Sequence, residues 1–245
     1  MLVTALFGPT GVGKTDIAIE LADLLRERGE DPIAISCDSL QIYEGLGRLT
    51  GAVTEAENER LEHRLVGFVP VGESFSIGDY MPLAHAEIDD ALGQGRRPIV
   101  LGGTGLYLRA ALAELSLQKV EPGEESELWS PETRHPTAIF GFTMEREELY
   151  GRIDARVDAI VAAGAESEVR AAEHEAGRTA RKALGFGELL AGDMEGMRRR
   201  SRNYARRQMT WMRKLPNVVT VDVTGRAPCD VASEVMHILA GREVP

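Results

Sequence analysis

A short apolar run at residues 2–7 leads directly into a glycine-rich segment, Gly8 to Thr15, with the sequence GPTGVGKT. The run is typical of a buried strand, and the apolar spacing from Lys14 to about Arg28 is typical of a helix. Between the two, glycines let the backbone curl so that its N–H groups point inward, and the helix N-terminus adds partial positive charge. This strand–loop–helix order fits G-x-x-x-x-G-K-[ST] and predicts a phosphate-binding loop, or P-loop.

The loop predicts the chemistry of a ligand without identifying the molecule. Lys14 can reach terminal phosphate oxygens, and the Thr15 hydroxyl can ligate Mg²⁺, the one metal cofactor that we expect. The predicted phosphate-binding positions in the loop are Gly8, Thr10, Gly11, Gly13, Lys14 and Thr15. Small-molecule kinases, nucleotide hydrolases and transferases that release pyrophosphate all fit such a loop.

The rest of the chain alternates short apolar runs with amphipathic stretches. Further strands are expected at residues 33–36, 98–101, 138–144 and 218–223. Helices are expected at about 79–92, 146–163, 165–176, 195–213 and 230–239, with one more that ends near Leu112. Because strand and helix alternate through the first half, we expect an α/β fold of the P-loop NTPase type. Its parallel sheet would be flanked by helices on both faces, with a helical C-terminal region.

Residues 113–137 interrupt this alternation. They contain several prolines and glutamates and little periodic apolar pattern, which predicts a loop or a flexible connector. The catalytic core is therefore expected in two stretches, residues 1–112 and 138–245, joined by this connector.

Asp38 follows the predicted strand at 33–36, at its carboxyl end. In open parallel sheets, ligands bind beyond this edge, where the P-loop is also expected. A carboxylate near bound phosphates either binds a cation or handles a proton. The alternative is that Asp38 only caps a turn, since Asp-Ser pairs are common in turns.

Composition narrows the cellular setting. The 245 residues include 39 acidic and 28 basic ones, a net charge of -11, with 43% hydrophobic residues. No apolar stretch reaches the roughly 18 residues that a membrane-spanning helix needs. The N-terminus lacks the features of a secretory signal, and Cys37 and Cys229 are too few for a disulfide framework. We therefore expect a cytoplasmic protein.

The charge is unevenly distributed along the chain. Residues 178–214 contain 11 Lys and Arg against 3 Asp and Glu, a balance of +8, while the rest of the chain has a balance of -19. Much of this basic segment lies on the helix predicted at 195–213, with Tyr204 interleaved. Taken alone, a solvated basic helix is the simpler interpretation, but such a segment also fits the neutralisation of nucleic-acid phosphates.

Three motifs resemble the tRNA dimethylallyltransferase family, also called tRNA isopentenyltransferases. They are GPTGVGKT from Gly8, SCDSLQIY from Ser36 and GGTGLY from Gly102. Shorter similarities follow in the family's order at residues 50–54, 62–65, 73–76, 79–80, 149–157, 183–186 and 202–211. Each piece is weak alone, but their common order is specific. The resemblance covers residues 2–112 and about 138–223.

The resemblance implies a reaction and roles for individual residues. A dimethylallyl group would pass from dimethylallyl diphosphate to N6 of the adenosine on the 3′ side of the tRNA anticodon, and the P-loop would hold diphosphate rather than ATP. Asp38 would be the base toward N6. Thr15 and an arginine, Arg152 in preference to Arg156, would bind the diphosphate, and so would Thr104. The implied catalytic residues are thus Asp38, Thr15 and Arg152.

The resemblance also assigns residues to RNA binding: Ser39, Gln41, Tyr43, Arg202, Arg206, Arg207 and Gln208. Together with the basic segment, these are expected to meet the anticodon loop of tRNA. We expect the chain to act as a monomer.

The chain departs from the family at residues 113–137. Family members carry there a helical insertion of several dozen residues that grips the anticodon stem-loop, and a D-x-Q-R-x-x-R-A-L-E stretch that this chain lacks. Two alternatives therefore stay open: a P-loop kinase or adenylate-type prenyltransferase with a small acceptor, and a non-catalytic remnant that binds RNA or nucleotide. Asp38 and the basic helix favour the tRNA enzyme over an enzyme with a small acceptor. Intact Lys14, Thr15 and Arg152, together with Asp38, argue against a non-catalytic remnant.

Overall fold

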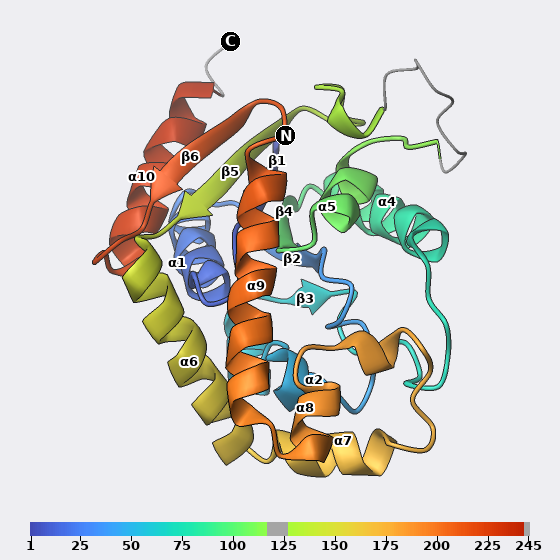
Figure 1. Ribbon diagram of the computed structural model, residues 1–245. Helices are drawn as coiled ribbons and strands as arrows, with labels where there is room; N and C mark the ends of the chain where they lie inside the picture. The colour runs from blue at the N-terminus through green and yellow to red at the C-terminus, as the bar shows by residue number, and fades with distance from the viewer. Residues whose placement is uncertain (117–126, 243–245) are drawn as a thin grey trace, which may run out of the picture.

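The computed structural model describes residues 1–116 and 127–242, and in this part of the chain a six-stranded parallel sheet forms the centre (Figure 1). In chain order the strands are β1 (Val3–Phe7), β2 (Pro32–Ser36), β3 (His63–Arg64), β4 (Arg97–Gly102), β5 (Thr137–Thr143) and β6 (Val218–Asp222). Their spatial order is β3-β2-β4-β1-β5-β6. β1 lies inside the sheet, where Leu6 pairs with Leu101 of β4 and Phe140 of β5. Every residue of β1, β2 and β4 is buried, which is why these strands appear in the sequence as short apolar runs.

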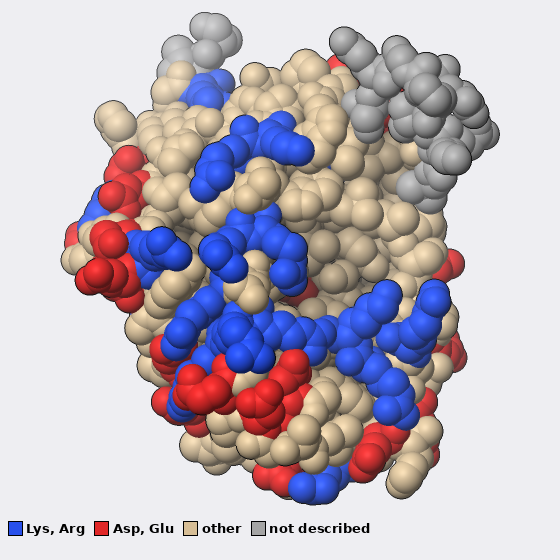
Figure 2. Space-filling model, in the orientation of Figure 1, with Lys and Arg blue, Asp and Glu red and all other residues tan. Residues whose placement is uncertain are grey.

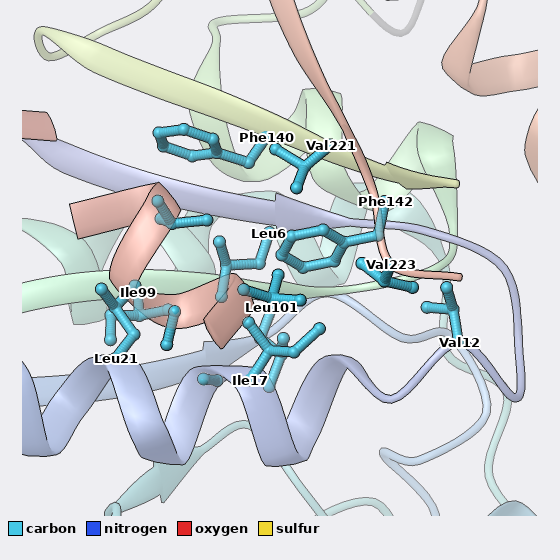
Figure 3. Close-up of a cluster of buried hydrophobic side chains, with 14 of the residues drawn as sticks. Leu6, Val12, Ile17, Leu21, Ile99, Leu101, Phe140, Phe142, Val221 and Val223 are labelled. Carbon is cyan, nitrogen blue, oxygen red and sulfur yellow. The ribbon is translucent and has the colours of Figure 1, made fainter. Parts of the chain in front are cut away.

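Helices cover both faces of the sheet, as predicted. α1 (Lys14–Glu27) and α10 (Pro228–Arg242) pack on one face, and α4 (Ile77–Gly93) and α5 (Gly105–Leu112) on the other. Strand side chains alternate between the two cores, so Leu6 joins the α1 side while Phe7 joins the α4 side. Figure 3 shows Leu6 and Phe142 meeting Ile17 of α1 in the first core.

A separate helical layer lies beyond the carboxyl end of β2. It contains α2 (Gly47–Thr50), α7 (Ala165–Ala172), α8 (Phe186–Ala191) and part of α6 (Arg146–Ala162), which share a third buried apolar cluster. α9 (Met194–Met212) joins this layer to the sheet, because Met197 packs in the third cluster and Met212 packs against the α4 face. Figure 1 shows α9 running across the molecule between the two regions.

The described ends of the 113–137 connector are tied down. The guanidinium of Arg109, on α5, donates hydrogen bonds to the carbonyls of Leu128 (3.0 Å) and Glu132 (3.3 Å). The N–H of Ser116 donates to the Glu127 carboxylate at 2.6 Å, which brings the two flanks together. Apart from a 3₁₀ turn at Glu127–Trp129, the described part is irregular, in line with the predicted loop, and residues 117–126 lie outside the described residues.

The structure adds elements that the sequence pattern did not predict. These are α2, α3 (Glu55–Arg60), β3, α8 and a 3₁₀ turn at Ala180–Lys182. All are too short to show a period, and α3 buries no residue at all. The helix predicted at 165–176 ends earlier, at Ala172. Among the described helices, none is both long and apolar enough to cross a membrane.

Candidate active site

The loop between β1 and α1 has the backbone shape that its glycines allow. Gly11 and Gly13 have φ of 83° and 92°, in the left-handed region that residues with a Cβ adopt only at a cost. Gly13 is also the residue that caps α1. The first turn of the helix therefore leaves its free N–H groups directed toward the loop, an arrangement that suits bound phosphate.

Lys14 folds back into this loop. Its Nζ donates hydrogen bonds to the carbonyl oxygens of Gly8 (2.9 Å) and Pro9 (3.0 Å). Burial lowers the pKa of Lys14 to about 8, although the nearby Asp38 carboxylate opposes the shift. The ammonium group is thus positioned for an anion and loses its charge in mildly alkaline solution.

This pKa predicts a pH dependence for ligand binding. The protonated amine attracts a diphosphate and the neutral amine does not, so affinity should fall as pH rises through about 8. Between about pH 7 and about pH 9, we expect the dissociation constant of inorganic diphosphate, measured by calorimetry, to rise about tenfold. Lys14→Arg is the control, because a guanidinium stays charged over this range. A wild-type curve as flat as that of Lys14→Arg would contradict the assignment.

Asp38 lies beyond the carboxyl end of β2, at the same edge of the sheet as the P-loop. The N–H of Cys37 donates to the carbonyl of Leu101 (2.8 Å), which extends the strand pairing by one residue. One Asp38 oxygen, Oδ1, accepts a hydrogen bond from the N–H of Leu40 at 3.0 Å. Asp38 and Lys14 line one cavity of about 450 Å³. The carboxylate therefore caps a turn and also lines the cavity with Lys14, so its capping role leaves it accessible to a ligand.

Two arginines of α6, one helical turn apart, reach this cavity at different depths. The Arg152 side chain is 41% exposed and pairs with Glu148 at 2.9 Å. The Arg156 side chain is half-buried, and its guanidinium donates to the carbonyl of Thr50 at 2.9 Å. Burial lowers the pKa of Arg156, and Asp38 opposes that shift, which places the two opposite charges close together.

Gly51 makes room for the deeper arginine. A Cβ at this position would lie 2.1 Å from Nη2 of Arg156, closer than any real contact. Gln41 holds the same loop, because its side-chain amide donates to the carbonyl of Gly51 at 3.0 Å. The segment at residues 50–54 is therefore shaped around the guanidinium.

Gln208 of α9 joins two loops of the site. Its Oε1 accepts a hydrogen bond from the N–H of Thr10 in the P-loop (2.8 Å), and its Nε2 donates to the carbonyl of Gly103 after β4 (2.8 Å). A Cβ at Gly103 would lie 2.2 Å from that Nε2, so the glycine admits the amide. Helix α9 thereby fixes the position of the P-loop.

This finding corrects two predicted RNA contacts. Gln208 is 4% exposed and Tyr43 is 1% exposed. The amide of Gln208 is committed to backbone partners, and the Tyr43 side chain lies in the apolar cluster shared with α2 and α7. Neither is available on the surface, because packing of the site's framework buries both.

Thr104 and Ser39 do not line the cavity themselves, but Thr104 contacts Tyr204, which does. The Thr104 hydroxyl lies 3.2 Å from the hydroxyl of Tyr204 and 3.4 Å from that of Ser39. Tyr204 itself lines the cavity, and burial raises the pKa of its phenol, so the hydroxyl stays protonated and able to donate. Thr104 is thus placed to orient Tyr204 and the turn after Asp38 rather than to line the cavity itself.

The cavity lining combines polar and apolar groups. The P-loop, Asp38 and the two arginines supply the polar groups. Apolar side chains come from α2, α6, α9 and the loops beside them: Leu49, Val53, Ile153, Val157, Ile160, Leu184 and Met197. A ligand with a charged head and a short hydrocarbon tail matches this combination.

Three further predicted RNA contacts, Arg202, Arg206 and Arg207, lie on α9. Arg202 pairs with Asp154 of α6, Arg206 donates to Asn203, and the exposed Arg207 lies over the ring of Tyr204. Figure 2 shows Lys and Arg side chains gathered over α9 and beside it, with acidic side chains at the border. This basic surface adjoins the cavity, because Tyr204 and Gln208 of the same helix line it.

Sequence reasoning located most of the site but not all of it. The predicted residues that line the cavity are Thr10, Gly11, Gly13, Lys14, Thr15, Asp38, Gln41, Arg152, Arg156 and Gln208. Gly8 lies beneath it as an acceptor for Lys14. The functional candidates missed were Thr54, Glu57 and Ser201. Tyr204, noted from the sequence as an aromatic residue within the basic helix, also lines the cavity. The family-like segment at 50–54 was a signal for Thr54.

The residues present suit a hard cation that is bound largely through a ligand. Within residues 1–116 and 127–242, no three His, Cys, Asp or Glu side chains are placed to hold a metal ion together. The Thr15 hydroxyl lines the cavity beside the P-loop. Mg²⁺ commonly takes few protein oxygens and several phosphate and water oxygens, so this donor set fits it.

Comparisons with known proteins identify the family of the chain. The model of the IPP transferase family matches residues 41–134 and 117–215. A tRNA dimethylallyltransferase of Anoxybacillus flavithermus is 30% identical over 98% of this chain and 96% of its own, and one from Thermobifida fusca is 32% identical over 88% of each. The first alignment runs over 305 positions, more than this chain's 245 residues. The crystal structure of a tRNA isopentenylpyrophosphate transferase from Bacillus halodurans superposes with a TM-score of 0.85 at 27% identity, covering 98% of this chain and 96% of its own.

Proposed function

The chain belongs to the IPP transferase family, and from that premise we propose that it transfers a dimethylallyl group from dimethylallyl diphosphate to tRNA, releasing diphosphate. One observation carries the proposal: the P-loop and Asp38 line one cavity together with a set of apolar side chains. The named relatives give no support to a small-molecule kinase or to a non-catalytic remnant.

We assign the acceptor atom as N6 of the adenosine on the 3′ side of the anticodon, following the family resemblance. The lone pair of this amine is delocalised into the ring, so the amine is a poor nucleophile. Asp38 would accept its proton as the C–N bond forms, a contribution of roughly 10²- to 10⁴-fold. The oxygen of Asp38 that does not cap the turn is the one suited to this task. The target base would leave the anticodon-loop stack to reach it.

The polar groups of the cavity would stabilise the leaving group. Negative charge grows on the diphosphate as the allylic C–O bond breaks. The P-loop N–H groups, Lys14 and the two arginines line the cavity where they can meet that charge, and Nη1 of Arg152 lies next to Gly13 of the P-loop. The Thr15 hydroxyl would help to hold Mg²⁺, which supplies further positive charge to the phosphate oxygens when bound.

The apolar lining would hold the five-carbon chain. A transition state with allyl-cation character reacts with water unless water is excluded from the site. The apolar side chains of the cavity, Val157 and Leu184 among them, would help to exclude it.

We further propose that residues 113–137 stand in place of the family's helical tRNA-binding insertion, between core segments 1–112 and 138–245. Two facts support this. The family model matches in two segments that overlap at 117–134, and the alignment to the Anoxybacillus relative needs more positions than this chain has residues. The monomeric state and the cytoplasmic location stay predictions.

Incubation with dimethylallyl diphosphate, Mg²⁺ and unmodified tRNA tests the activity directly. Nucleoside mass spectrometry of the digested tRNA should reveal N6-dimethylallyladenosine, and mapping by nuclease digestion should place it beside the anticodon. Prenylated AMP in place of modified tRNA, or consumption of ATP with a small acceptor, would overturn the proposal.

A further inference from the structure

A second hollow, separate from the active-site cavity, lies between α6 and α9. Its volume is about 450 Å³, within the range of small-ligand sites. We call it the α6–α9 groove, and its lining residues are Met144, Arg146, Leu149, Tyr150, Ala205, Arg206, Met209, Thr210 and Arg213. The floor is formed by apolar groups, with Met144, Leu149 and Ala205 in the main core.

The rim of the groove is cationic. Arg146, Arg206 and Arg213 line it, and its lining includes no Asp or Glu. Arg146 lies over the ring of Tyr150 at 5.3 Å, and a fourth guanidinium, Arg202, lies 5.7 Å from the same ring. In the described part of the chain, no ion pair engages Arg206 or Arg213, which are both exposed. The groove therefore presents positive charge above an apolar floor.

Helix α9 is the wall that the groove shares with the active site. Tyr204 and Gln208, four residues apart, line the active-site cavity, and the next row around the helix, Ala205 and Met209, lines the groove. A chain that enters the active site and crosses α9 reaches the groove after about one helix diameter, roughly 10 Å. Figure 2 shows that the surface crossed is rich in Lys and Arg.

We propose that the α6–α9 groove binds an unpaired nucleotide of the RNA substrate, close in the chain to the nucleotide that enters the active site. A nucleotide joins a flat, largely apolar base to an anionic phosphate, and the groove offers an apolar floor beneath three guanidinium groups. The phosphodiesters on the two sides of a nucleotide carry two negative charges for these three guanidinium groups, whereas a fatty acid carries only one. The proposal rests on the proposed function, because it takes tRNA as the substrate.

The groove also matters for how a shortened enzyme holds RNA. With only a connector at residues 113–137, the anticodon arm would depend more on contacts from the core. A pocket beside α9 supplies such a contact without the insertion.

Arg213→Gln tests the rim, and Arg199→Gln is its matched control. Both arginines are exposed and belong to the α9 segment, and both substitutions remove one charge, but only Arg213 lines the groove. Binding of an anticodon stem-loop RNA, followed by fluorescence anisotropy at several salt concentrations, is the readout. For Arg213→Gln we expect a dissociation constant about tenfold higher and a salt slope smaller by about 1. For Arg199→Gln we expect the dissociation constant to rise by about twofold or less.

Thr210→Glu tests the interior of the groove, with Thr220→Glu on β6 as its control. Both threonines are exposed, so both variants should fold, which circular dichroism can verify. The carboxylate at 210 should weaken RNA binding more than the one at 220 and leave the affinity for dimethylallyl diphosphate unchanged. Equal losses within either matched pair would overturn the groove as a nucleotide site.

The outcomes separate this inference from the proposed function. If the wild type binds the RNA through the groove but modifies no tRNA, the proposed function fails and the groove assignment is supported. If tRNA is modified and the groove variants behave like their controls, the groove assignment fails alone. Displacement of the RNA by poly-glutamate as readily as by oligouridylate would also overturn it, since the groove would then respond to charge alone.

Discussion

Asp38→Asn should slow dimethylallyl transfer by roughly 10²- to 10⁴-fold, the usual contribution of a positioned general base. The substitution preserves shape, and the amide oxygen can still accept the hydrogen bond that the carboxylate takes from the N–H of Leu40. What it removes is the negative oxygen that would accept the proton of the N6 amine. The turn should therefore survive while the chemistry is lost.

Single-turnover rates with saturating tRNA and dimethylallyl diphosphate measure this loss, and calorimetry measures diphosphate binding separately. Binding should weaken little or even tighten, because a negative charge near the diphosphate disappears. Asp31→Asn is a matched control, since Asp31 is an exposed carboxylate just before β2, at the opposite end of the strand that leads to Asp38. Transfer by Asp38→Asn at a rate close to that of Asp31→Asn would remove Asp38 from its role as base.

The main elements of the fold were predictable because their burial leaves a pattern in the sequence. β1 and β2 are buried along their whole length, so each is a continuous apolar run. α1 buries one side, including Ile17 and Leu21, and so shows the helical period. The parallel arrangement then follows from the alternation of strands and helices.

The unpredicted elements lack such a pattern. β3 is two residues long and is an edge strand that pairs with β2 alone. α3 is held by the capping box of Thr54 and Glu57 and not by an apolar face. α8 begins after Gly185, whose positive φ of 95° separates the helix from the segment before it. Local capping and close contacts, which carry no period, define all three.

The site divides in the same way. The P-loop and Asp38 lie at positions that the sheet topology dictates, so the sequence alone locates them. The depth at which a distant side chain enters the cavity is set by tertiary packing. Gln208 and Tyr43 belong to family-like motifs, yet helix packing turns both inward. The choice between Arg152 and Arg156 depends on tertiary packing in the same way, because their spacing in the sequence places both on one face of α6.

Arg156→Gln should lower kcat/KM by roughly 10²- to 10³-fold, the typical effect of removing one donor to a developing negative charge. The Arg156 guanidinium lies in a buried pocket beside Asp38, where low dielectric strengthens its field. Arg152→Gln should lower kcat/KM by about tenfold or less. The Arg152 side chain is 41% exposed and already paired with Glu148, so solvent screens its charge.

The comparison of the two arginines is decisive only if both variants keep the fold. Arg156 also holds the carbonyl of Thr50, so its loss could loosen the loop at residues 50–54, and thermal unfolding should be recorded for each variant. Arg156→Lys separates the two roles: it keeps a positive charge but loses the planar donor pair, and should recover part of the rate lost in Arg156→Gln. A larger loss for Arg152→Gln than for Arg156→Gln, at equal thermal stability, would reverse the assignment. Arg152, whose guanidinium lies beside Gly13 of the P-loop, would then be the main partner of the leaving diphosphate.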